Sequence, residues 1–138
     1  MVDKHTKQQR SYNMSKIKNS NTKPEQLVCK SLFHLGYRYR KNDKRFPGKP
    51  DIYLPKYKTV IFVNGCFWHG HEGCTKSKLP KTNYEFWKEK IDNNTARDKR
   101  NIKKLESMGF QVITVWECDI KKSLESIIDN IDSRLKNI

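Results

Sequence analysis

One apolar run constrains the fold of this chain more than any other feature of its sequence. Residues 59–63 read TVIFV, five consecutive positions of which most are β-branched. A strand with one exposed face alternates apolar and polar residues, so an unbroken run predicts a strand buried on both faces. The chain has 138 residues, which fits one compact domain with helices covering such a strand.

Three more strands and three helices are predicted around this run. The expected strands are 37–41, 51–54 and 111–116, and the expected helices start at Thr22, Tyr84 and Leu124. A capping-box spacing opens the first helix, whose apolar stripe includes Leu35, and Gly36 ends it. The second helix runs to Met108, its last core contact, and the polar residues 92–95 (DNNT) predict a break within it. The order α-β-β-β-α-β-α indicates an α/β domain with a short sheet covered by helices.

Charge is the first indication of function. Lys and Arg total 29 against 15 Asp and Glu, a formal net charge of +14, and the excess is concentrated in residues 1–50. A short basic chain binds polyanions by releasing their counterions, which favours nucleic acid over a merely solvated basic surface or an anionic membrane. Residues 1–21 are polar and basic, which predicts an arm that an anionic partner orders. No run approaches the roughly 20 apolar residues of a membrane span, and we expect an intracellular protein.

A set of Cys and His residues predicts a metal site. Cys66, His71 and Cys74 lie within nine residues, and Cys118 follows the strand 111–116. Four soft ligands suit tetrahedral zinc, and a site with four protein ligands is structural because it leaves no position for water. The alternative is a set of free buried thiols with an incidental histidine. Cys29, within the first helix, is expected to be a buried thiol.

Two carboxylates are candidates for a magnesium site. Asp51 follows Pro50 at the start of a strand, and Glu25 lies in the preceding helix. Magnesium binds hard oxygen ligands, and phosphodiester hydrolysis uses such a cation to offset charge on the leaving oxygen and to activate water. Pro-Asp is the first half of a nuclease signature, but the next strand lacks the acid and lysine of the second half. Asp51 as a turn former and Glu25 as the closing residue of a capping box therefore stay open.

An aromatic pair, Phe67-Trp68, lies in the glycine-flanked loop that carries the metal ligands. In a basic protein, rigidly held aromatic side chains on a loop can wedge between base pairs. The alternative is a hydrophobic plug that covers the zinc.

Together these motifs resemble the very-short-patch repair (Vsr) endonucleases. The matching segments span nearly the whole chain: Arg10-Ser11-x-Asn13-Met14, Pro47-Gly48-x-Pro50-Asp51, Gly65-Cys66-Phe67-Trp68-His69 with His71 and Cys74, Tyr84-x-Phe86-Trp87, and Val115-Trp116-Glu117-Cys118. The resemblance implies a restriction-endonuclease-like core, a small mixed sheet flanked by helices with a structural zinc. It also implies a strand-specific endonuclease that nicks 5′ to the thymine of a T:G mismatch left by deamination of 5-methylcytosine.

The same resemblance implies roles for individual residues. Asp51 would bind the catalytic Mg²⁺ with the backbone carbonyl of Val63, and Glu25 would support it. His69 would be the catalytic histidine. Phe67, Trp68 and Trp87 would intercalate beside the mismatch, and the arm, with Arg10, Asn13 and Met14, would clasp the duplex. Asn64 stands where the family pattern has a second active-site histidine, and it cannot titrate near neutrality. The prediction therefore relies on His69 and a magnesium-activated water.

The sequence thus predicts a basic arm, 1–21, and a catalytic domain, 22–138. We expect a monomer in the bacterial cytoplasm, at the nucleoid, acting on double-stranded DNA with a T:G mismatch and possible help from other repair proteins. Two alternatives remain open at this point. One is a small restriction-type or homing endonuclease that cuts unmismatched DNA, and the other is a non-catalytic zinc-stapled DNA-binding module.

Overall fold

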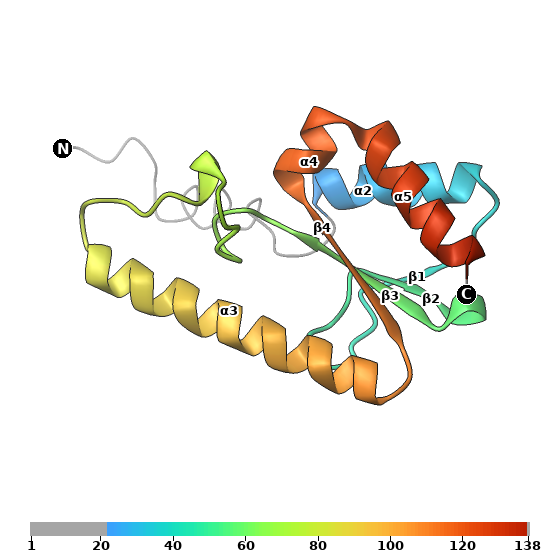
Figure 1. Cartoon of the computed structure of the whole chain (residues 1–138), viewed down its shortest axis with the longest axis horizontal. Helices are drawn as coiled ribbons and strands as arrows, with labels where there is room; N and C mark the ends of the chain where they lie inside the picture. Colours follow the sequence, from blue (N-terminus) through green and yellow to red (C-terminus); the bar gives the residue numbers. More distant parts are fainter. Residues whose placement is uncertain (1–21, 138) are drawn as a thin grey trace, which may run out of the picture.

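The computed structural model describes residues 22–137, which form a four-stranded sheet between helices (Figure 1). The strands are β1 (Arg40–Lys41), β2 (Ile52–Leu54), β3 (Thr59–Asn64) and β4 (Gln111–Trp116), in that spatial order. β1–β2 and β2–β3 pair antiparallel and β3–β4 pairs parallel, so the predicted small mixed sheet is confirmed. The helices are α2 (Lys23–His34), α3 (Tyr84–Ser107), α4 (Glu117–Lys122) and α5 (Leu124–Lys136), with short 3-10 turns at Pro55–Tyr57 and Thr75–Ser77.

The hydrophobic core lies between the sheet and the helices α2, α4 and α5, which share one side of it (Figure 1). The run 59–63 forms most of β3, and Thr59, Val60 and Ile61 are fully buried, as its composition predicted. Cys29 is the buried thiol expected in the first helix. The core residues of the cluster are Val28, Cys29, Leu32, Tyr37, Ile52, Leu54, Ile61, Ile113, Val115, Ile120, Ile128, Ile131 and Leu135.

Helix α3 covers the other side of the sheet and is a single helix of 24 residues (Figure 1). The predicted break at 92–95 is wrong because these polar side chains bond within and beyond the helix. Thr95 Oγ1 donates to the Ile91 carbonyl at 2.9 Å, and Asn94 Nδ2 donates to the Trp68 carbonyl at 3.1 Å. Lys88 forms an i,i+4 ion pair with Asp92 at 3.1 Å. Only Ile91 and Leu105 of this helix are buried.

Other boundaries differ from the prediction for local reasons. β1 is shorter than 37–41 because Tyr37 turns into the core, where its hydroxyl donates to Asp132 of α5. Leu35 and Met108 were expected in the core, but both are about half exposed, since each is the C-cap residue at which its helix ends. The short helix α4 was not predicted, and it carries Cys118.

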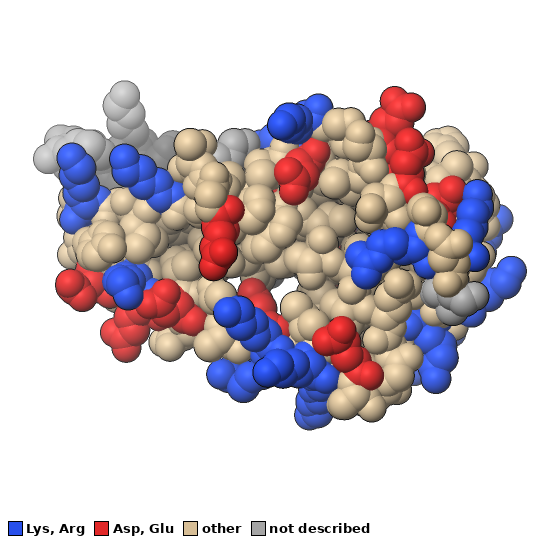
Figure 2. All heavy atoms as spheres, viewed as in Figure 1, with Lys and Arg blue, Asp and Glu red and all other residues tan. Residues whose placement is uncertain are grey.

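Lys and Arg side chains gather over the middle of α3 on the face shown in Figure 2, and Asp and Glu gather near its N-terminal end. Among residues 22–137, no helix combines the length and apolar composition of a membrane span. The predicted arm, with Arg10, Asn13 and Met14, lies outside the described residues.

Candidate active site and metal centre

The four predicted metal ligands meet where β3 and β4 end. These strands are parallel neighbours in which Asn64 pairs with Trp116, so both chains leave the sheet at the same edge. Cys66 lies two residues beyond Asn64, and Cys118 lies two residues beyond Trp116, in the first turn of α4. The loop after Cys66 then turns back to add His71 and Cys74. The register of the sheet therefore unites ligands that are about fifty residues apart in sequence.

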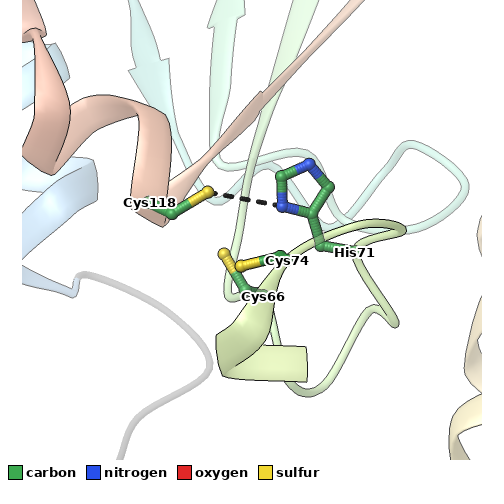
Figure 3. Close-up of side chains that lie close together, drawn as sticks. All are labelled: Cys66, His71, Cys74 and Cys118. Carbon is green, nitrogen blue, oxygen red and sulfur yellow. Dashed lines mark hydrogen bonds between the residues drawn. The ribbon is translucent and has the colours of Figure 1, made fainter. Parts of the chain in front are cut away.

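The side chains of Cys66, His71, Cys74 and Cys118 point toward one another (Figure 3). Their ligand atoms all lie within 4.8 Å of one another, and Cys118 Sγ is 3.4 Å from His71 Nδ1. Ligand atoms around tetrahedral zinc are roughly 3.8 Å apart, given a Zn–S length of about 2.3 Å. Burial and the neighbouring thiols of Cys66 and Cys74 raise the pKa of the Cys118 thiol to about 12, so thiolates at this spacing need a cation. The cluster could hold a metal ion.

Trp116 stacks on the ring of His71, with centroids 4.1 Å apart and planes 6° apart. This contact orients the imidazole, and the sequence reasoning missed it. Trp116, at the end of β4, therefore contacts one of the four candidate ligands directly.

Two carboxylates are buried together at the start of β2. Asp51 is 9% exposed and Glu25, in the first turn of α2, is 1% exposed. Asp51 Oδ2 accepts a hydrogen bond of 2.7 Å from the Val63 amide of β3. Burial, opposed by this amide and reinforced by the Glu25 carboxyl, raises the pKa of Asp51 to about 8. Two adjacent buried carboxyls are costly unless a proton or a cation compensates them.

Glu25 does not close a capping box. Thr22 Oγ1 accepts from the Glu25 amide at 3.5 Å, which is half of such a box. The other half requires the Glu25 carboxylate to accept from the Thr22 amide, but both Glu25 oxygens are buried without a hydrogen-bond partner among residues 22–137. A buried carboxylate with empty acceptor positions beside Asp51 fits the oxygen ligand set of a hard divalent cation. The capping-box interpretation of Glu25 is therefore wrong.

His69 forms a close pair with Asp98 of α3. His69 Nδ1 and Asp98 Oδ2 are 2.6 Å apart, and the side chains are 30% and 26% exposed. A carboxylate at Nδ1 fixes the ring and leaves Nε2 to act on solvent or substrate. Asp98 was missed, although one signal existed in the sequence. It shares a helix face with the apolar residues Ile91, Ile102 and Leu105, and a carboxylate on such a face indicates a bonding partner.

Asn64, the last residue of β3, is 7% exposed. It lines a small cavity between the sheet and α3, together with Phe62, Asp98, Asn101, Ile102 and Thr114. Asn64 thus faces the same cavity as Asp98, the partner of His69. The amide of Val63, the residue before Asn64, donates to Asp51. The end of β3 connects the carboxylate pair to the His69–Asp98 pair.

Gly70 allows the loop to approach α3 closely. Its φ is +59°, and an added Cβ would lie 2.9 Å from Ile91 Cγ2 and 3.1 Å from Thr95 Oγ1. A larger residue here would adopt a strained backbone conformation and would have to displace the Ile91 and Thr95 side chains of α3. The approach brings His69 within reach of Asp98.

Four aromatic side chains pack edge to face at the N-terminal end of α3. The ring centroids of Phe67 and Trp68 are 5.2 Å apart, and Trp87 lies 5.6 and 5.9 Å from them, with Phe86 at 5.2 Å from Trp87. Trp68 is 40% exposed and Phe86 is 58% exposed. An aromatic cluster that is open to solvent can stack against a flat, apolar group.

A solved structure with a similar fold indicates the class of this protein. The catalytic domain of the homing endonuclease I-Bth0305I matches with a TM-score of 0.54 and 25% sequence identity, covering 81% of this chain and 92% of that one. Together with the two buried carboxylates and the His69–Asp98 pair, this similarity defines the protein as a DNA endonuclease.

The chain belongs to the Vsr family. The family model described as DNA mismatch endonuclease Vsr matches residues 2–76. The type II nicking enzyme V.NmeAIP of Neisseria meningitidis serogroup A / serotype 4A is 57% identical over 88% of this chain and 86% of its own length. DNA mismatch endonuclease Vsr of Escherichia coli K12 is 42% identical over 88% of this chain and 77% of its own length. The resemblance read from the motifs is confirmed.

Proposed function

We propose that this protein is a strand-specific mismatch endonuclease that nicks DNA 5′ to the thymine of a T:G mismatch in very-short-patch repair. The observation that carries the proposal is the exposed aromatic cluster of Phe67, Trp68, Phe86 and Trp87, because the same loop carries His69 two residues after Phe67. Aromatic side chains that can separate two stacked base pairs therefore lie next to a histidine that can accept a proton. The names of the relatives, nicking enzymes and a mismatch endonuclease, support the same activity.

The proposed catalytic core is restriction-endonuclease-like and holds a magnesium ion at Asp51. Glu25 would support the ion through its buried carboxylate, and the backbone carbonyl of Val63, whose amide donates to Asp51, would be the second protein ligand. When bound, the ion would offset negative charge on the leaving oxygen and lower the pKa of the attacking water. In its absence the Asp51 carboxyl holds a proton near neutrality, because its pKa is about 8.

His69 is the proposed general base. Its Nε2 takes a proton from the attacking water as the water oxygen bonds to phosphorus and the bond to the 3′ oxygen breaks. Asp98 holds the Nδ1–H and stabilises the imidazolium that forms. Asn64 donates an amide N–H to the phosphate or the water, and it neither gives nor takes a proton.

The Cys66, His71, Cys74 and Cys118 cluster is proposed to bind structural zinc. Four protein ligands leave no open position, so this ion holds the loop and α4 together and takes no part in hydrolysis. Cys66 lies three residues from His69. The zinc would therefore fix the loop that carries the catalytic histidine and the aromatic cluster.

Phe67, Trp68 and Trp87 are proposed to wedge beside the mismatch. Unstacking a base step costs a few kcal/mol, and the cost is least where the pair is already mismatched. The arm 1–21, with Arg10, Asn13 and Met14, is proposed to clasp the duplex while the domain 22–138 cuts. We propose that the protein acts as a monomer at the nucleoid, in the cytoplasm, where its DNA substrate lies.

A nicking assay with magnesium tests the chemistry. Asp51→Asn and His69→Gln should each lose at least a hundredfold in single-turnover rate while binding the duplex almost as tightly. His34→Gln is the matched control, since His34 is an exposed residue of α2. Unchanged nicking in either site variant, or equal nicking without any divalent cation, would refute the assigned core.

One alternative retains a specific observation in its favour. The structural neighbour is a homing endonuclease, which makes cleavage of unmismatched DNA the second candidate function. Equal rates on matched and T:G duplexes would favour it. A binding module without catalysis would have no use for the buried Asp51–Glu25 pair or for the His69–Asp98 pair.

A further inference from the structure

Helix α3 presents three different faces along its 24 residues. At 100° per residue, one face points at the sheet and carries the aromatic, apolar and catalytic contacts: Trp87, Ile91, Thr95, Asp98, Ile102 and Leu105. A second face, turned to solvent, mixes both signs of charge: Glu85, Lys88, Glu89, Asp92, Lys99, Lys103 and Glu106. Such mixing is typical of an ordinary solvated helix face.

The third face carries no acidic residue. Within about 60° of Arg97 on the helical wheel lie Phe86 of the aromatic cluster, four basic side chains and three amides. We call the basic side chains and the amides the α3 basic edge: Lys90, Asn93, Asn94, Arg97, Arg100, Asn101 and Lys104. Its four cations are exposed, and none forms an ion pair within residues 22–137. On the mixed face, by contrast, Lys88 is paired with Asp92 at 3.1 Å. Unpaired cations that share one edge attract a polyanion together.

The α3 basic edge passes directly beside the catalytic groups. At one end, Lys90 Nζ lies 5.6 Å from the ring centroid of Trp68. In the middle, Arg97 precedes Asp98, which holds His69, and its guanidinium donates to Asn94 at 3.0 Å. This amide contact orients the guanidinium and leaves its charge uncompensated.

At the other end, Lys104 and Asn101 line an open groove together with Arg45 and Phe46 of the loop before β2. Gly48 lets this loop lie against the helix, because its φ is +79° and an added Cβ would be 3.0 Å from Asn101 Nδ2. The groove therefore runs from α3 to the loop that ends at Asp51, but the charge of Arg45 in this loop is compensated by Asp43 at 2.7 Å.

We propose that the α3 basic edge forms a track that binds the phosphate backbone of the substrate duplex across the nick site. Lys90 and Lys104 are fourteen residues apart, about 21 Å along the helix, which matches roughly six base steps of 3.4 Å. Amides donate to phosphate oxygens as lysine and arginine do. The proposal rests on DNA as the substrate, as the proposed function does, but it is independent of mismatch selection.

Salt-dependent binding of the full chain to a matched duplex, measured without magnesium, tests the track. The double variant Arg97→Gln/Lys104→Gln should lower the slope of log affinity against log salt concentration by about 1.8, or 0.9 for each lost phosphate contact. At 0.1 M salt its affinity should fall by at least roughly tenfold. Lys99→Gln/Lys103→Gln removes the same charge from the mixed face and should keep the wild-type slope. Arg97→Lys should restore most of the loss at its position.

Equal slopes for the two double variants would overturn the proposal. All four substitutions are at exposed helix positions, and matching melting curves would show that each variant is folded. A wild-type protein that fails to nick T:G DNA would refute the proposed function while leaving the difference in slope intact, so the two failures are distinguishable.

Discussion

Replacing Asp51 by asparagine should stabilise the magnesium-free protein while abolishing nicking. The folded protein holds the pKa of Asp51 at about 8, above the ordinary 3.8, chiefly through burial. Between these values the folded chain keeps a proton that the unfolded chain releases. The stability of the magnesium-free protein therefore falls as pH rises from about 4 to about 8, and then levels. Asparagine does not titrate, so Asp51→Asn removes this contribution to the pH dependence of stability.

The size of the effect follows from the same pKa. At pH 7 the proton linkage costs the wild-type fold on the order of 4 kcal/mol. Asparagine keeps an oxygen that accepts from the Val63 amide, but it buries an amide group that costs about 1–3 kcal/mol if it finds no acceptor. A net gain of about 2 kcal/mol corresponds to roughly 5–10 °C in Tm for a domain of this size.

Thermal melts at pH 5, 7 and 8.5, with and without magnesium, measure the stability of Asp51→Asn relative to the wild type. Elemental analysis should accompany the melts to show whether the proposed zinc is retained, since a chelator used to remove magnesium would also remove zinc. Without magnesium, Asp51→Asn should melt above wild type at pH 7 and 8.5. Added magnesium should raise only the wild type. Asp129→Asn, at an exposed site in α5, is the matched control. A lower Tm for Asp51→Asn at pH 8.5, or an unchanged pH slope, would refute the reasoning.

Three more substitutions test separate parts of the site. Cys118→Ser should lower zinc content and Tm together, since a structural metal contributes folding energy, and native protein without stoichiometric zinc would contradict the ligand set. Asp98→Asn should reduce the nicking rate about 10²–10⁴-fold, because the His69 ring loses its charged partner; a rate within threefold of wild type would contradict the pairing. Trp68→Ala should keep zinc and Tm but shrink the ratio of nicking on T:G over T:A duplexes. An early-melting, zinc-poor variant with an unchanged ratio would favour a hydrophobic plug.

Much of this fold could be predicted because its signals are local. The unbroken apolar run of β3 required cover on both faces, and helix periodicity located α2, α3 and α5. The metal cluster was predictable from ligand types and spacing, since parallel neighbouring strands bring Cys66 and Cys118 to the same edge. These features depend on patterns within a few residues of each other, or on a single adjacency in the sheet.

What could not be predicted depends on contacts made only in the folded chain. Residues 92–95 have poor helix propensity, and the helix continues through them because Asn94 bonds to the Trp68 carbonyl and the neighbouring Ile91 is buried. Asp98 becomes the partner of His69 only when the loop at Gly70 meets α3. Glu25 satisfied a capping motif in the sequence, whereas burial beside Asp51 gives its carboxylate a different environment.

The most direct test of the central claim is single-turnover nicking of paired duplexes that differ only in one base pair, T:G or T:A. Each strand is labelled in turn, so that both the strand and the position of the cut are read. We expect one nick, on the thymine strand, immediately 5′ to the mismatched thymine, with a rate on T:G far above that on T:A and no nick with Asp51→Asn. Equal rates on the two duplexes, cuts in both strands, or a cut elsewhere would contradict it.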